Sequence, residues 1–128
     1  MINIMAKKKE SPQPDKEQFE MFRDLFNEMY AEINEMKKKK PDGIVNAFKV
    51  ERINRVLKPL YDLMKEEPYI SYLEFVPEPR EEKSGRSTIE AGLTYSDVML
   101  ILSQYRSGLG QFFQKYFYTP IDLETFGV

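Results

Sequence analysis

The chain of 128 residues contains no cysteine, no histidine and no tryptophan. Without cysteine there is neither a disulfide framework nor a thiolate nucleophile. Without histidine the chain lacks the side chain that ordinarily titrates near neutral pH, which is also the commonest metal ligand. A Ser-His-Asp or Cys-His catalytic arrangement is therefore impossible, and no Ser-x-x-Lys spacing replaces it. We expect a protein that is not an enzyme and that carries no metal and no cofactor.

Long apolar runs are also missing. No stretch reaches the roughly 18 apolar residues of a membrane-spanning helix, and residues 1–10 lack the apolar core of a secretory signal. The formal net charge of −2 gives no overall attraction to a polyanion. We expect a cytoplasmic protein without a membrane partner, and its size and style are typical of bacterial, phage or mobile-element proteins.

What the chain does have is strong helical periodicity, above all at residues 98–117. Apolar or aromatic side chains recur there at steps of four and three residues, the spacing of one helix face: Val98, Leu102, Tyr105, Leu109, Phe112 and Tyr116. Thr94 or Ser96 is suited to cap this helix. Glycine destabilises a helix by about 1 kcal/mol relative to alanine, so Gly108 and Gly110 indicate a close packing contact.

A second periodic stretch predicts a helix over residues 16–39, capped by Asp15. Its apolar stripe has the a/d spacing of a short coiled coil: Phe19, Phe22, Phe26, Met29, Ile33 and Met36. Two roles for this stripe stay open, packing on the domain's own core or pairing with a partner. In the second role the protein interface consists of Phe22, Phe26, Met29, Tyr30 and Ile33.

The segment between these two helices predicts a third helix and a hairpin. The helix covers residues 45–66, and Pro59 predicts a kink or a break near residues 56–59. Residues 69–76 and 87–93 are rich in β-formers and predict a short hairpin with a charged loop at 77–86. A helical turn over residues 69–75 is the alternative for the first of these strands.

These elements together predict a mainly α fold. It is a small three-helix domain with a kinked second helix and a short β-hairpin between helices 2 and 3. We place the single helical domain at residues 15–118, within the usual size of one domain. A flexible N-terminal tail at 1–14 and a C-terminal tail at 119–128 flank it. The C-terminal tail alternates apolar and acidic residues, which suits packing on the core or docking on a partner.

Basic side chains gather in one part of the chain and give a candidate nucleic-acid-binding patch: Lys37, Lys38, Lys39, Lys40, Lys49, Arg52, Arg55 and Lys58. Such a patch could meet several phosphates, and the binding would weaken steeply with salt. Asn46 and Asn54 could add hydrogen bonds. The acidic character of residues 15–36 opposes this role, and no helix-turn-helix pattern is present.

Two functions follow from these patterns. The first is a non-enzymatic interaction or regulatory protein that binds another protein, or its own copy as a homodimer, through an aromatic- and Met-bearing helical face. Aromatic residues and Met are enriched at protein interfaces, which favours this role. The alternative is a nucleic-acid-binding accessory protein that uses the basic patch at residues 37–58.

Overall fold

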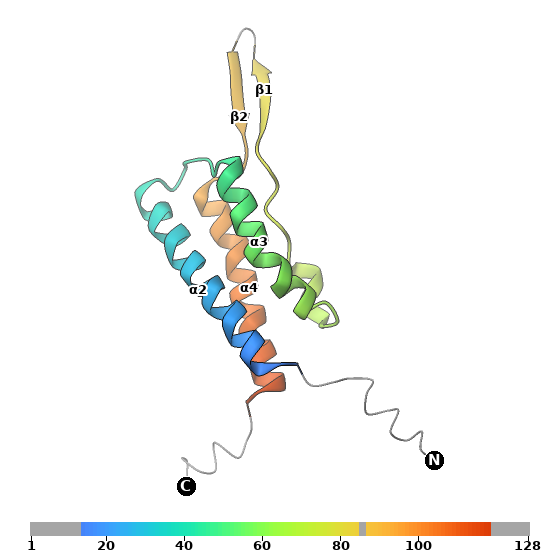
Figure 1. Ribbon diagram of the computed structural model, residues 1–128. Coiled ribbons are helices and arrows are strands. Elements are labelled where there is room, and N and C mark those ends of the chain that lie inside the picture. Colours follow the sequence, from blue (N-terminus) through green and yellow to red (C-terminus); the bar gives the residue numbers. More distant parts are fainter. Residues whose placement is uncertain (1–13, 85–86, 119–128) are drawn as a thin grey trace, which may run out of the picture.

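The computed structural model describes residues 14–84 and 87–118, with the backbone alone described at 81–84 and 87–91. The predicted tails at 1–14 and 119–128 lie outside these residues, apart from Pro14. Within the described ranges the chain is mainly helical, with α2 (Lys16–Lys39), α3 (Ala47–Leu63) and α4 (Tyr95–Tyr116). A 3₁₀ helix, η1 (Pro68–Tyr72), precedes two short strands, β1 (Arg80–Ser84) and β2 (Ser87–Ala91). Figure 1 shows the three long helices side by side.

Each helix begins where a polar side chain satisfies its first free N–H groups. Asp15 accepts from the backbone of Glu17 at 3.0 Å, and Asn46 accepts from Lys49 N at 2.8 Å. Thr94 and Asp97 form a reciprocal capping box at the start of α4. The observed bounds of α2 agree with the prediction, because cap and periodicity are both local signals.

The core lies between the three helices. In α4 the predicted stripe is confirmed, since Leu102 and Tyr105 are fully buried and Tyr116 alone of its members is partly exposed. Phe19 of α2 stacks on Phe112 of α4, with ring centroids 5.6 Å apart. The buried apolar residues are Phe19, Phe26, Ile33, Val45, Val50, Ile53, Leu57, Leu60, Met64, Leu73, Val76, Tyr95, Val98, Met99, Leu102, Tyr105, Leu109 and Phe112.

The connection between α2 and α3 pairs with the segment that leads into α4. Val45 N donates to Leu93 O at 3.0 Å, and Tyr95 N donates to Gly43 O at 3.0 Å. The Ser96 hydroxyl donates to Pro41 O at 3.1 Å. These bonds hold together, at one end of the bundle, two loops that lie about fifty residues apart in the sequence.

Two predicted features are corrected. The predicted kink or break of the second helix is not supported, since α3 is a single helix over Ala47–Leu63 with Pro59 inside it. The predicted strand at 69–76 is wrong, since this segment holds η1 and then an extended stretch. Pro68 at the first position of η1 favours the helical alternative.

Of the two strands that the backbone forms, β2 lies within the second predicted segment, 87–93, whereas β1 lies within the predicted loop at 77–86. Arg80 is opposite Ala91, and Ser84 is opposite Ser87. This antiparallel pair projects from the end of the helical bundle instead of packing along it (Figure 1).

Buried polar groups fix the opposite end of the bundle. The Glu67 side chain is 5% exposed and lies just before η1. It accepts from Lys115 Nζ at 2.9 Å and from the Tyr116 hydroxyl at 2.7 Å, both on α4. The hydrogen bond to Glu67 raises the pKa of Lys115 above its ordinary value. This cluster joins the segment after α3 to the last turn of α4.

A candidate protein-interaction groove between α2 and α3

The predicted interface on α2 divides into core residues and groove residues. Phe26 is fully buried and Ile33 is 3% exposed, so neither is available to a partner in this fold. Phe22, Met29 and Tyr30 are half-buried against the same core. The part of the prediction that places Phe26 and Ile33 on a binding face is therefore corrected, because their stripe packs on α4 and α3 of the same chain.

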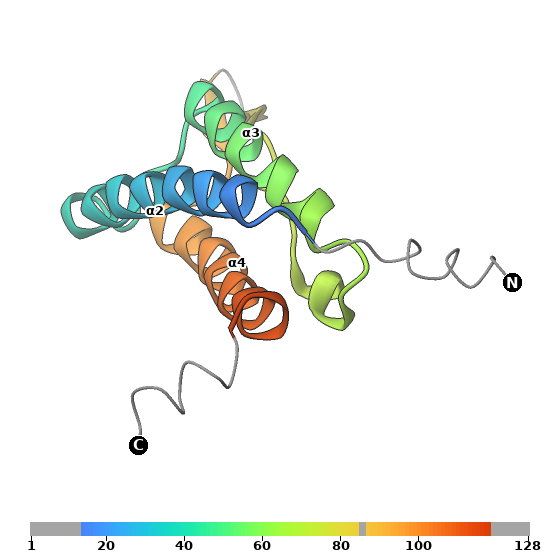
Figure 2. The same ribbon diagram turned by 60° about the horizontal axis from the view of Figure 1, so that its bottom comes forward.

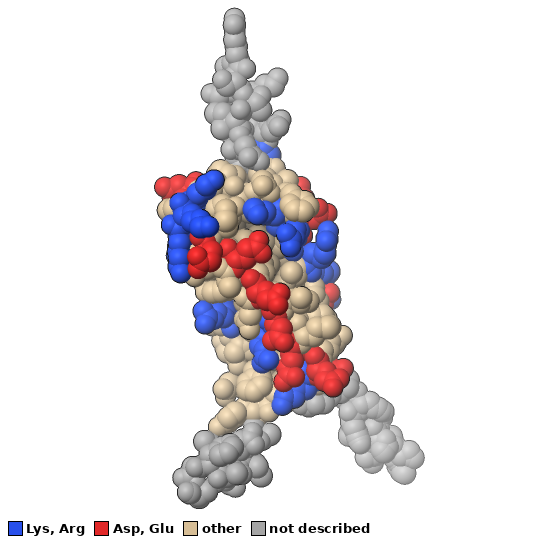
Figure 3. Space-filling view, turned by 60° about the vertical axis from the view of Figure 1, so that its left-hand side comes forward, with Lys and Arg blue, Asp and Glu red and all other residues tan. Residues whose placement is uncertain are grey.

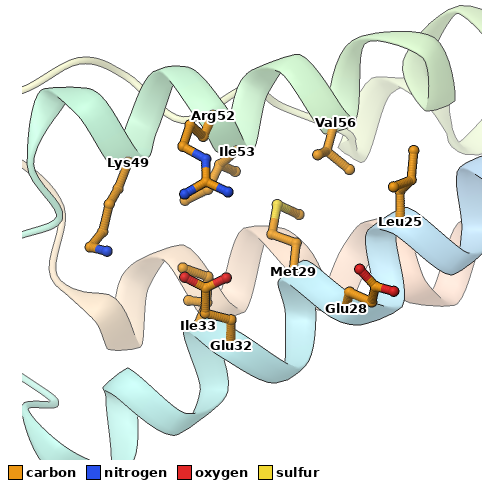
Figure 4. A pocket seen from close by; sticks show the side chains of 9 residues that line it. All are labelled: Leu25, Glu28, Met29, Glu32, Ile33, Lys49, Arg52, Ile53 and Val56. Carbon is orange, nitrogen blue, oxygen red and sulfur yellow. The ribbon is translucent and has the colours of Figure 1, made fainter.

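The surface that α2 leaves open is a groove shared with α3, about 160 Å³ in volume. Figure 4 shows its lining, with α2 below and α3 above. The lining residues are Leu25, Glu28, Met29, Glu32, Ile33, Lys49, Arg52, Ile53 and Val56. We call it the α2–α3 groove. Two of the nine residues, Met29 and Ile33, belong to the interface predicted from the sequence, and Lys49 and Arg52 belong to the predicted basic patch.

The two walls of the α2–α3 groove carry opposite charge. Glu28 and Glu32 stand on the α2 wall, while Lys49 and Arg52 extend from the α3 wall toward the gap (Figure 4). Within the described part of the chain, no ion pair of 4.0 Å or less joins the two walls. These four charges are therefore not neutralised in pairs across the groove.

Large exposed apolar side chains either line this groove, as Leu25 does, or lie next to residues that line it. Leu25 is 49% exposed, and Met21, one helical turn earlier on α2, is 53% exposed. Phe48 on α3 is 65% exposed, and the Arg52 guanidinium lies over its ring at 5.8 Å from the centroid. Sequence reasoning did not assign Leu25 and Phe48 to the interface. The sequence could have indicated them, because each is a large apolar residue that lies off the buried stripe of its own helix.

The basic residues do not form one continuous patch. Lys38 pairs with Glu35 at 3.2 Å, Arg55 with Glu51 at 3.7 Å, and Lys58 with Asp62 at 3.1 Å, all exposed pairs. Figure 3 shows a column of acidic side chains running between separate groups of basic ones. The lysines at 37–40 are exposed at the end of α2, whereas the other four residues lie on α3.

Two asparagines that were candidates for nucleic-acid contacts have roles within the fold. Asn46 caps α3. The Asn54 amide pairs with the backbone of Val76 through two hydrogen bonds of 2.9 Å, and it holds the extended segment after η1 against α3. Neither side chain is therefore available for base or phosphate recognition without breaking these bonds.

The described residues contain no group of three or more acidic side chains placed to hold a metal ion. In the same part of the chain, none of the helices has the length and hydropathy needed to cross a membrane. Comparisons with protein-family models, with curated proteins and with solved structures found no match for this chain.

Proposed function

We propose that this chain is a non-enzymatic interaction protein that binds a second copy of itself through the α2–α3 groove. The observation that carries the proposal is the pairing of an acidic wall with a basic wall across a partly apolar floor. Electrostatic complementarity of this kind sets the orientation of an interface more than its affinity. The apolar floor and rim provide the area whose burial favours association.

A two-fold axis along the groove makes the surface complementary to itself. Such an axis places the α2 wall of one copy over the α3 wall of the other at the same level of the groove. Glu28 and Glu32 then face Lys49 and Arg52 of the second copy, because all four residues line one stretch of the groove.

The same rotation brings Leu25, which lines the groove, and Phe48, which lies under Arg52, toward the second copy. Full burial of an exposed apolar side chain of this size is worth about 1.5–3 kcal/mol. Burial of these two apolar side chains therefore favours association, and the four charged residues fix how the two copies are aligned.

Charge reversal on one wall at a time tests the proposal. A chain with Glu28→Lys and Glu32→Lys has two basic walls, and a chain with Lys49→Glu and Arg52→Glu has two acidic walls. We expect each variant alone to be monomeric in sedimentation, while the unaltered chain reaches twice its mass of 15.2 kDa. An equimolar mixture of the two variants should recover the dimer, because each copy then offers what the other lacks.

A matched control changes charge outside the groove. Arg55 is exposed on α3 and does not line the groove, so the variant Arg55→Glu should leave dimerisation unchanged. Circular dichroism confirms that every variant is folded. The proposal is contradicted if the unaltered chain is monomeric at all concentrations. It is also contradicted if each of the two charge-reversal variants still forms a dimer by itself.

Nucleic-acid binding is the alternative, and one observation favours it. Lys37, Lys39 and Lys40 are exposed and, within the described residues, form no ion pair. In this case the molar mass rises when duplex DNA is added at low salt, and the complex dissociates as salt increases. Replacing the three lysines by glutamine should abolish that complex without altering the mass of the chain alone.

A further inference from the structure

A second groove lies between α2 and α4, and its volume is about 260 Å³. Its lining includes Arg23 and Asn27 from α2 and Arg106, Gly110 and Phe113 from α4. Figure 2 shows α2 with α3 on one side and α4 on the other. We call this second groove the α2–α4 groove. None of its lining residues lines the α2–α3 groove, so its occupant is independent of the proposed dimer.

The lining of the α2–α4 groove is positively charged. Each helix contributes one arginine, and neither Asp nor Glu lines the groove. Glu28 and Glu32 of α2 line the other groove instead. In a chain with 21 acidic residues, a lining with two arginines and no carboxylate is a locally basic surface. Charge complementarity therefore favours an acidic occupant.

Both guanidinium groups are reachable from solvent and are held against aromatic rings. Arg106 is exposed, lies over the Tyr30 ring at 5.0 Å from the centroid, and donates to its hydroxyl at 3.3 Å. The Arg23 side chain is 35% exposed and lies over the Phe19 ring at 5.6 Å, with the exposed Asp24 carboxylate 3.7 Å away. Among the described residues, no carboxylate pairs with Arg106. A guanidinium has more N–H donors than these contacts use, and cations that are already positioned lose less entropy on binding.

The two guanidinium groups lie at separate points along the groove. Arg106 lies at the Tyr30 ring, and Arg23 lies between its own position on α2 and the Phe19 ring. At 1.5 Å per helical residue, these positions are about 10–16 Å apart along α2. One carboxylate is too small to reach both cations. In an extended peptide, residues four positions apart lie on the same side and about 13 Å from each other, which matches this separation.

Gly110 leaves room for the residue between two such acids. It is exposed, and a Cβ atom built at Gly110 would meet nothing within 4 Å. Glycine allows the backbone of a ligand to approach closely. Phe113, nearly one turn further along α4, is half-buried and offers part of its ring. The middle residue of the extended segment points to the same side as the two acids, so an apolar side chain there fits beside Gly110 and Phe113.

We propose that the α2–α4 groove binds an extended acidic segment of a partner protein, with acidic residues at positions i and i+4 and an apolar residue at i+2. The two carboxylates pair with Arg23 and Arg106, and the apolar side chain lies beside Gly110. Arginine and carboxylate form charge-assisted hydrogen bonds, often two in parallel, which favours a carboxylate as the group recognised. A nucleic-acid strand matches less well, because it carries a charge at every nucleotide whereas the groove supplies two separated cations.

A short peptide tests the proposal. The probe is Glu-Ser-Leu-Ser-Glu with both ends blocked, titrated into the isotope-labelled chain while amide NMR signals are recorded. We expect the signals of Asn27 and Gly110 to shift, and that of Arg55 on α3 to stay constant. The neutral peptide Gln-Ser-Leu-Ser-Gln should bind about tenfold more weakly, because both ion pairs are lost. Ser-Glu-Leu-Glu-Ser, whose acids are two positions apart, should also bind more weakly than the probe.

Variants of the chain separate the charges from the space between them. Arg23→Gln and Arg106→Gln should each weaken binding of the probe about threefold, since each removes one ion pair. Gly110→Leu keeps both arginines but fills the open space, so it should abolish binding. Arg55→Gln is the matched control, because Arg55 is an exposed arginine outside both grooves, and it should leave binding unchanged. Circular dichroism shows whether each variant is folded.

Several outcomes overturn the proposal. They are constant signals at Asn27 and Gly110 in millimolar probe, equal binding of the neutral peptide, and unchanged binding to the folded Gly110→Leu variant. Shifts centred on Lys49 and Arg52 would place the peptide in the α2–α3 groove and contradict it as well. A single-stranded DNA oligonucleotide that shifts Asn27 and Gly110 at lower concentration than the probe would assign the groove to nucleic acid instead.

Discussion

At the residue scale, the least expected feature is a pair of buried hydroxyl groups without hydrogen-bond partners among the described residues. They belong to Tyr69 and Tyr105. Tyr105 is fully buried between the helices, and Tyr69 is half-buried beside Gly108. An unsatisfied buried polar group costs about 1–3 kcal/mol, so each hydroxyl opposes the stability that its ring provides.

Removing one of these hydroxyls should therefore not harm the fold. We expect Tyr105→Phe to raise the free energy of unfolding at neutral pH by about 1 kcal/mol, because the ring stays while the unsatisfied group is removed. Urea denaturation measures the change. Tyr116→Phe is the control and should lower stability, since its hydroxyl donates to Glu67 at 2.7 Å. Equal losses in the two variants would contradict this account of Tyr105.

Single residues also show how much of the candidate site could be predicted from the sequence. Helical spacing correctly places Phe26 and Ile33 on the inner face of α2, but spacing alone does not tell whether the facing surface belongs to the same chain or to a partner. Leu25 and Phe48 were overlooked because a stripe describes what is buried. Asn54 is a clearer case, since its two bonds to Val76 span 22 residues and no local pattern predicts them.

At the scale of elements, the helices were predictable, and so was the position of β2, but the segment that pairs with it was not. The bounds of α2 and α4 depend on caps and apolar stripes within each segment, which the sequence displays directly. The hairpin was misplaced because residues 69–76 combine β-forming side chains with contacts from elsewhere. Asn54 and α4 hold this segment in place of a strand partner. Tertiary contacts commonly override such weak local preferences.

The two glycines of α4 provide a matched test of packing within one helix. Gly110→Ala should raise the free energy of unfolding by about 0.5–1 kcal/mol, because the new methyl group enters open space. Gly108→Ala should gain less or lose stability, since its Cβ would lie 3.2 Å from the Tyr69 ring and 3.3 Å from Met64 Sδ. Thermal or urea unfolding compares them, and an equal gain at both positions would refute the packing role of Gly108.

At the scale of the whole molecule, α2 is the element on which the proposed dimer depends. It packs against α3 and α4, and a groove runs along each contact. The α2–α3 groove offers walls of opposite charge, whereas the α2–α4 groove carries two arginines. The segregated charges of the sequence thus become separate surfaces in the fold.

The tyrosines also give the whole molecule a predicted pH dependence. Burial raises the pKa of Tyr69 to about 12 from an ordinary value of 10.0, and it raises the pKa of Tyr105 and Tyr95 as well. The unfolded chain therefore releases these protons near pH 10, while the folded chain keeps them. The contribution of these tyrosines to the free energy of unfolding is therefore complete below pH 10. It should fall as the pH rises toward about 12, by at most about 1.4 kcal/mol per pH unit for each tyrosine.

Lys115 acts in the same direction, because its pKa is raised by Glu67 and its ion pair is lost when the lysine is deprotonated. Tyr30 acts in the opposite direction, since the hydrogen bond from Arg106 lowers its pKa. The raised groups outnumber the lowered one, so we expect the urea midpoint to fall with pH above 10. Tyr69→Phe should make that fall less steep, because one of the shifted groups is absent. A midpoint that stays constant from pH 10 to 12 would show that these hydroxyls ionise as readily in the folded chain as in the unfolded one.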